Sequence, residues 1–104
     1  MTAAFQALAD PTRRTLLDRL RTEMRPLSLT DLADGLPITR QAVTKHLDAL
    51  RRAGLLRVWT SGRERLHQLE PAPLREVTEW LAPYAAAWDA RLARLQAHLE
   101  EDDR

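Results

Sequence analysis

The 104-residue sequence contains no cysteine, which excludes disulfides, a thiolate nucleophile and thiolate metal sites and fits a reducing compartment. Its N-terminus lacks a basic stretch followed by a long apolar run, so we expect no signal peptide. No apolar run approaches the roughly 20 residues that a membrane span needs. Common catalytic motifs are also missing, namely paired carboxylates, a glycine-rich phosphate loop and HExxH. These absences predict a soluble, cytoplasmic protein that is not an enzyme and uses no cofactor.

The length and the hydrophobic content of 44% favour a single domain, residues 1–104, with a modest core. Charge is distributed unevenly along this domain. Residues 1–39 are balanced, residues 40–65 hold seven basic and two acidic side chains, and residues 66–104 hold four basic and eight acidic ones. A basic middle in a chain of net charge +1 is typical of a polyanion-binding surface, although a solvated charged face would explain it equally well.

Helical patterns fill the first half of the sequence. We predict a short helix at about residues 3–9 and a second helix at about 11–24, which Pro26 would end. Asp10 can cap the second helix and Pro11 can begin it, because the N–H that proline lacks is not needed in the first helical turn. The apolar residues of the second helix recur at helical spacing, at Leu16, Leu17, Leu20 and Met24.

The next two predicted helices have the order and spacing of a helix-turn-helix. A short helix at about 29–35 begins with Ser28 and Asp31, which have the spacing of a capping box. The turn Leu36-Pro37-Ile38-Thr39 then leads into a helix at 40–53. We therefore expect a helix-turn-helix at about residues 29–53. In this motif the second helix lies in the DNA major groove, with its N-terminal residues at the base edges.

The predicted recognition helix has two different faces. Val43, Leu47 and Leu50 form an apolar face that we expect to contact the core. The opposite face carries side chains that can hydrogen-bond to bases or phosphates. The candidate DNA contacts are Thr39, Arg40, Gln41, Thr44, Lys45 and His46. His46 adjoins the apolar face, so a structural hydrogen bond explains it as well as a phosphate contact does.

Beyond this helix the pattern changes to β-structure. The segments LLRVWT and RLHQLE are rich in β-formers and are separated by the turn signal SGRE, which predicts a β-hairpin at about 55–70. Arg63 and Arg65 lie at its tip, as in a wing laid along the DNA, and Arg57 is a third candidate phosphate contact. The predicted fold is mainly α with a small β-hairpin, which is a winged helix-turn-helix.

A long last helix is predicted at about residues 73–101, with Pro83 either kinking it or splitting it. Large apolar side chains recur along it every three or four positions. They could pack on the monomer core, line a ligand pocket or bury a two-fold interface. Because a small monomer has little core to cover them, we expect dimerisation helices at about 3–9 and 73–101. The candidate interface residues are Phe5, Leu8, Trp80, Leu81, Tyr84, Trp88, Leu92, Leu95 and Leu99.

Two long segments resemble the ArsR-type family of bacterial winged helix-turn-helix repressors. They are FQALADPTRRTLLDRL and LSLTDLADGLPITRQAVTKHLDALRRAGLLRVWTSGRERLHQL, which together cover about residues 5–70. The last segment, WLAPYAAAWDARLARLQAHL, also looks like the dimerising helix of one branch of that family. The resemblance implies a homodimer that binds double-stranded DNA at an imperfect palindrome near its own promoter and represses by blocking polymerase.

The metal sites of that family are not matched here. The position of its usual cysteine-based site on the first helix of the motif is occupied by Leu32-Ala33-Asp34. The last helix has Asp89-x-Arg91 and His98-x-x-Glu101, so one half of the family's acid–histidine pattern lacks its histidine. We therefore expect no metal, and the resemblance to a branch without metal sites implies no effector.

Two other interpretations stay open from the sequence. One is a winged helix that contacts protein or RNA instead of DNA. The other is a repressor with a small-molecule inducer pocket at the dimer interface, between the last helices.

Overall fold

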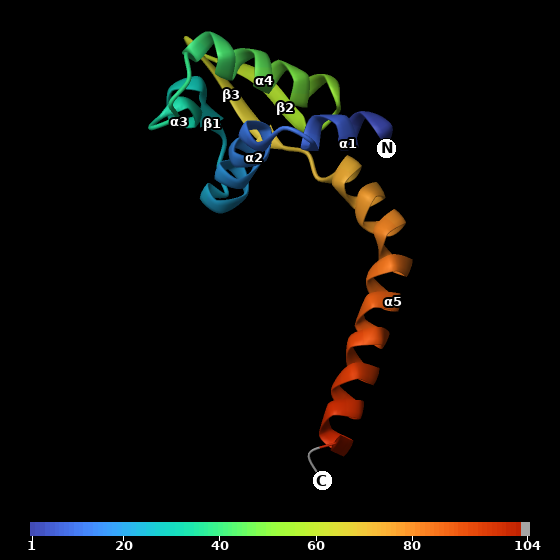
Figure 1. Cartoon of the computed structure of the whole chain (residues 1–104). Helices are drawn as coiled ribbons and strands as arrows, with labels where there is room; N and C mark the ends of the chain where they lie inside the picture. The colour runs from blue at the N-terminus through green and yellow to red at the C-terminus, as the bar shows by residue number, and fades with distance from the viewer. Residues whose placement is uncertain (103–104) are drawn as a thin grey trace.

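The structure, a computed structural model, describes residues 1–102. In this range the helices are α1 (Thr2–Leu8), α2 (Pro11–Glu23), α3 (Leu29–Ala33), α4 (Arg40–Arg52) and α5 (Ala72–Asp102). The strands are β1 (Leu27–Ser28), β2 (Leu56–Ser61) and β3 (Glu64–Leu69). Figure 1 shows that α1 to α4 group together with the small sheet, while α5 leaves this group as a long arm.

Capping residues determine where α2 begins and ends. The Asp10 carboxylate accepts hydrogen bonds from the backbone N–H groups of Thr12, at 2.8 Å, and Arg13, at 3.1 Å. The Arg13 bond is the main reason why the pKa of Asp10 lies below its usual value. Met24 adopts a left-handed conformation with φ 54°, so the helix ends just before it, earlier than Pro26 alone predicts.

The capping box predicted for α3 is confirmed. The Ser28 hydroxyl accepts from the Asp31 amide and the Asp31 carboxylate accepts from the Ser28 amide, both at 3.2 Å. These bonds lower the pKa of Asp31. At the other end, Arg19 of α2 donates from Nη1 to the carbonyls of Leu32 at 3.0 Å and Asp34 at 2.5 Å. A side chain from α2 thus caps the short α3, which would otherwise leave these acceptors unpaired.

Helix α4 has a cap at each end. Thr39 accepts a hydrogen bond from a backbone N–H in the first turn. At the C-terminus the N–H of Leu55 donates to the carbonyl of Leu50 at 3.0 Å, and the N–H of Gly54 donates to that of Arg51 at 2.9 Å. These two bonds form a Schellman motif, and Gly54 occupies its left-handed position with φ 78°.

The sheet has three strands where the sequence predicts two. All pairs are antiparallel and the order is β1-β3-β2. In β1, Leu27 pairs with His67 and Ser28 pairs with Leu66. The buried His67 ring also donates from Nδ1 to the Leu27 carbonyl at 2.9 Å. A strand of two residues is too short to show an alternating pattern, so β1 could not be predicted from the sequence.

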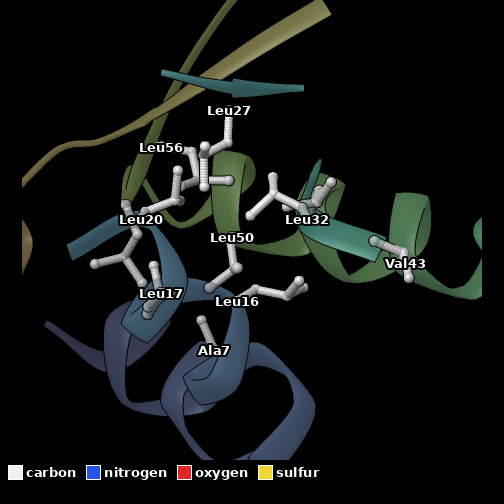
Figure 2. Packing of buried hydrophobic residues seen from close by; sticks show 11 residues of the cluster. Ala7, Leu16, Leu17, Leu20, Leu27, Leu32, Val43, Leu50 and Leu56 are labelled. Carbon is white, nitrogen blue, oxygen red and sulfur yellow. The ribbon is translucent and has the colours of Figure 1, made fainter. Parts of the chain in front are cut away.

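One hydrophobic core joins α1 to α4 with the sheet (Figure 2). Leu8, predicted at the dimer interface, is partly buried and packs against this core, because α1 turns it inward. The core residues are Ala7, Leu16, Leu17, Leu20, Leu27, Leu32, Val43, Leu47, Leu50, Leu55 and Leu56.

Within residues 1–102, helix α5 packs against α1 near its beginning. Val77 is buried, and Trp80 packs edge-on against Phe5 of α1, with ring centroids 5.6 Å apart. Pro83 lies inside one continuous helix, so of the two alternatives left open by the sequence the structure shows no split, and Figure 1 shows a curved arm. No helix within residues 1–102 is long and apolar enough to cross a membrane.

Candidate nucleic-acid interface

Helix α4 separates buried and exposed residues as its sequence predicts. Val43 and Leu50 are fully buried and Leu47 is 4% exposed, so three side chains anchor the helix in the core. The polar residues at its N-terminal end are exposed, namely Thr39, Arg40, Gln41, Thr44 and Lys45. The core therefore fixes the helix in a position where this end faces outward.

Arg40 is linked to the first helix of the motif. Its guanidinium donates a hydrogen bond to the hydroxyl of Thr30 at the beginning of α3. Within α4, the Thr44 hydroxyl donates to the Arg40 carbonyl at 3.0 Å. The sequence does not single out Thr30, and only its place in the first turn of a capped short helix could have suggested a role beside α4.

His46 joins α4 to the start of α2. Its Nδ1 accepts a hydrogen bond from Nε of Arg13 at 3.3 Å and lies 3.9 Å from a carboxylate oxygen of Asp10. Its side chain is 22% exposed. Of the two roles open from the sequence, the structure shows the structural one.

The two faces of the wing separate the candidate arginines. Side chains paired across antiparallel strands share a face, and neighbours along a strand alternate. Arg65 pairs with Thr60, and the same face carries Val58, which lines the groove toward α4. Arg57 lies on the opposite face, where its guanidinium stacks 5.9 Å from the ring of Trp59. Arg57 and Arg65 therefore lie on opposite faces of the wing.

A groove of about 440 Å³ runs between α4 and the wing. Apolar side chains of Leu29, Leu47 and Val58 contribute to its lining. Polar and charged residues complete it, namely Ser28, Thr30, Thr44, Lys45, Asp48, Arg51, Arg63, Glu64, Arg65 and His67. The groove thus brings the first half of α4 and the wing tip together on one surface.

The electrostatics of this groove favour an anion. Asp48 is held by Arg51 and Arg52, each at 2.8 Å, and the hydrogen bond from Arg51 lowers the pKa of Asp48 most. Within residues 1–102, Lys45 and the two wing-tip arginines, Arg63 and Arg65, form no ion pair. In the same part of the chain, no three histidine or acidic side chains gather closely enough to hold a metal ion.

The apolar face of α4 anchors this helix in the core, and its polar N-terminal half is exposed beside a cationic hairpin. This arrangement defines a winged helix-turn-helix protein. This class binds DNA with its second motif helix in the major groove. A family described as "Helix-turn-helix domain" matches residues 8–58.

Curated relatives agree with this class. The HTH-type transcriptional regulator Rv2034 of Mycobacterium tuberculosis is 44% identical over 71 residues, which are 68% of this chain and 64% of that relative. The uncharacterized HTH-type transcriptional regulator YuzN of Bacillus subtilis is 38% identical over 76% of this chain and 92% of its own length. The transcriptional repressor SdpR of Bacillus subtilis is 27% identical over 78% of this chain and 88% of its own length.

A solved structure identifies the family. The crystal structure of an ArsR family transcriptional regulator superposes with a TM-score of 0.73 at 35% identity, covering 85% of this chain and 89% of that one. The chain belongs to the ArsR family of winged helix-turn-helix transcriptional regulators, which are not enzymes.

Proposed function

We propose that the chain is a homodimeric transcriptional repressor that reads an imperfect palindrome with one α4 helix in each half-site. The observation that carries the proposal is the exposed end of α4 beside the cationic wing tip. The likeness to the named repressor SdpR supports repression as the outcome. Repression would follow from a dimer that covers a promoter and blocks polymerase, including the promoter of its own gene, in the bacterial cytoplasm.

The proposed DNA contacts divide into two groups. Arg40 and Gln41, at the very start of α4, have the side chains that bond base edges bidentately. Thr39, Thr44 and Lys45 on the same helix would bind bases or phosphates, and Arg63 and Arg65 would neutralise phosphates along the backbone. His46 and Arg57 are not in this set, because His46 is hydrogen-bonded to Arg13 and Arg57 stacks on the ring of Trp59.

The exposed apolar face of α5 is the reason for proposing a second subunit. Its large apolar side chains from Trp80 to Leu99 are between 40% and 62% exposed. Monomeric soluble proteins rarely expose so large a contiguous apolar surface. Phe5 of α1, at 38% exposure, extends this surface through its contact with Trp80. Burial against the same face of a partner would cover both helices and give a symmetric interface.

The proposal is tested by fluorescence anisotropy on DNA from upstream of the chain's own gene, over a series of salt concentrations. Arg40→Ala or Gln41→Ala should cost about 1–3 kcal/mol in operator binding and relax the preference at one base position. Unchanged affinity and selectivity in both variants would refute the assigned role of α4. Selective binding to RNA or to a protein, without binding to this DNA, would favour the competing winged-helix function.

A further inference from the structure

The groove between α4 and the wing has a chemistry that DNA alone does not explain. A sugar–phosphate strand can use its cations, but phosphate oxygens gain nothing from contact with apolar carbon. The groove nevertheless places Leu29, Leu47 and Val58 in its lining. Its volume of about 440 Å³ lies within the range of pockets that hold small organic molecules.

The cations of the groove lie beside these apolar residues. Arg65 and Val58 are on the same face of the wing, on neighbouring strands, and Lys45 approaches from α4. Four basic residues line the groove against two acids. Arg51 is paired with Asp48, so three basic residues remain against one acid. Glu64 is the remaining acid of the lining. The excess of basic over acidic side chains in the lining therefore favours a negatively charged ligand.

We propose that this groove is a binding site for a small organic anion with an apolar body, such as a medium-chain carboxylate. The carboxylate pairs with Arg65 and Lys45, because arginine binds carboxylates with charge-assisted hydrogen bonds. The hydrocarbon body covers Val58 and Leu29, the partly exposed apolar residues of the lining, which a free phosphate cannot do. Occupation of the groove removes the cations from DNA, so the ligand competes with the operator; this last step rests on the proposed function.

Direct binding is measured on the full chain without DNA. Decanoate below its micelle concentration is titrated, and the affected amides are located by NMR. Decanol supplies the apolar body without the charge, and propionate supplies the charge without the body. The expected result is a shift of amides in α4, β2 and β3, with a Kd for decanoate at least about tenfold below either control. Shifts confined to α1 and α5 would overturn the proposal.

A matched pair of wing variants tests the site itself. Arg65→Gln removes a cation from the groove face and should raise the Kd of decanoate about tenfold. Arg57→Gln removes one from the opposite face and should change this Kd less than about twofold. Equal losses in the two variants, or no loss in either, would show that the anion does not bind in the groove.

Competition is then measured by anisotropy on promoter DNA, with sodium propionate at the same concentration as the salt control. The apparent Kd for DNA should rise in proportion to the decanoate concentration. Promoter binding without any groove shifts by decanoate would refute this inference and leave the proposed function intact. Groove binding by decanoate in a chain that binds no promoter DNA would support the site and contradict the proposed function instead.

Discussion

Single side chains connect the elements of this protein across long sequence distances. Arg19 of α2 caps the carbonyl end of α3, and Arg13 of the same helix donates to His46 of α4. Arg40 of α4 reaches Thr30 of α3. Each link joins two of the helices that must keep a fixed angle if α4 is to face DNA. These polar links supplement the apolar core, which has no directional preference.

Met24 is a residue in a conformation that its side chain disfavours. Its φ of 54° is left-handed, and its side chain is 88% exposed, so burial does not offset the strain. Met24→Gly should therefore stabilise the fold by about 1 kcal/mol. Urea unfolding measures the change. Met24→Ala keeps the Cβ and should give no such gain; equal stabilisation by both substitutions would contradict the explanation.

The buried His67 makes stability depend on pH. Burial lowers the pKa of His67 below its usual 6.5, the hydrogen bond to the Leu27 carbonyl opposes this shift, and the charge of Arg65 adds to it. The unfolded chain thus binds the proton more tightly than the folded one. The contribution of the neutral His67 to the free energy of unfolding is fully present above pH 6.5. It is lost as the pH falls below 6.5 toward the lower pKa that His67 has in the folded chain.

This dependence is measured as the unfolding free energy between pH 8 and about pH 5. His67→Gln removes the titrating group and should give a smaller loss of stability over the acid part of that range than the unchanged chain. The comparison uses the slope with pH, so an overall loss of stability in the variant does not affect it. Identical slopes would show that His67 is not responsible.

At the scale of elements, the wing separates two arginines that the sequence treats alike. Arg65→Gln, on the face toward α4, should lower the slope of log affinity against log salt by about 0.9, the value for one phosphate. Arg57→Gln, on the opposite face, should leave that slope unchanged. Anisotropy titrations at several salt concentrations measure both. A loss of slope for Arg57→Gln alone would mean that the other face of the wing meets DNA.

Most elements could be predicted because their signals are local. The Asp10 cap, the Ser28 capping box and the Gly54 turn lie within a few residues of the ends they define, so periodicity and capping chemistry identify these helices. Strand β1 could not be predicted, because it exists only through pairing with β3, about 40 residues later. The exposed end of α4 was predictable for the same local reason.

The rest of the site depends on tertiary structure. Residue type alone cannot show that His46 is engaged by Arg13, since 33 residues separate them. The separation of Arg57 from Arg65 needs the register of the hairpin, in which a shift by one residue would exchange the two faces. The groove between α4 and the wing likewise forms only when the two elements are placed side by side.

At the scale of the molecule, the chain is elongated, with extents of 67 × 28 × 22 Å. Trp88 lies on the exposed arm, 58% accessible. Trp88→Ala should shift the chain toward monomers in analytical ultracentrifugation and weaken operator binding, because coupling between half-sites is lost. Trp59→Ala removes an exposed tryptophan from the wing and should leave the dimer unchanged. A Trp88→Ala chain that stays dimeric would assign the aromatic residues to another role.

Pro83 makes α5 less stiff at one turn than along the rest of its length. It has no N–H to donate to the carbonyl of Glu79, so one turn of this helix holds a bond fewer than its neighbours. Bending is easiest there, and the helix on either side behaves as a stiff lever. About 28 Å of helix follows the proline, so a rotation of roughly 10° at this turn displaces the far end by about 5 Å. In a dimer held together by its two α5 helices, bending at this single turn would change the distance between the two α4 helices.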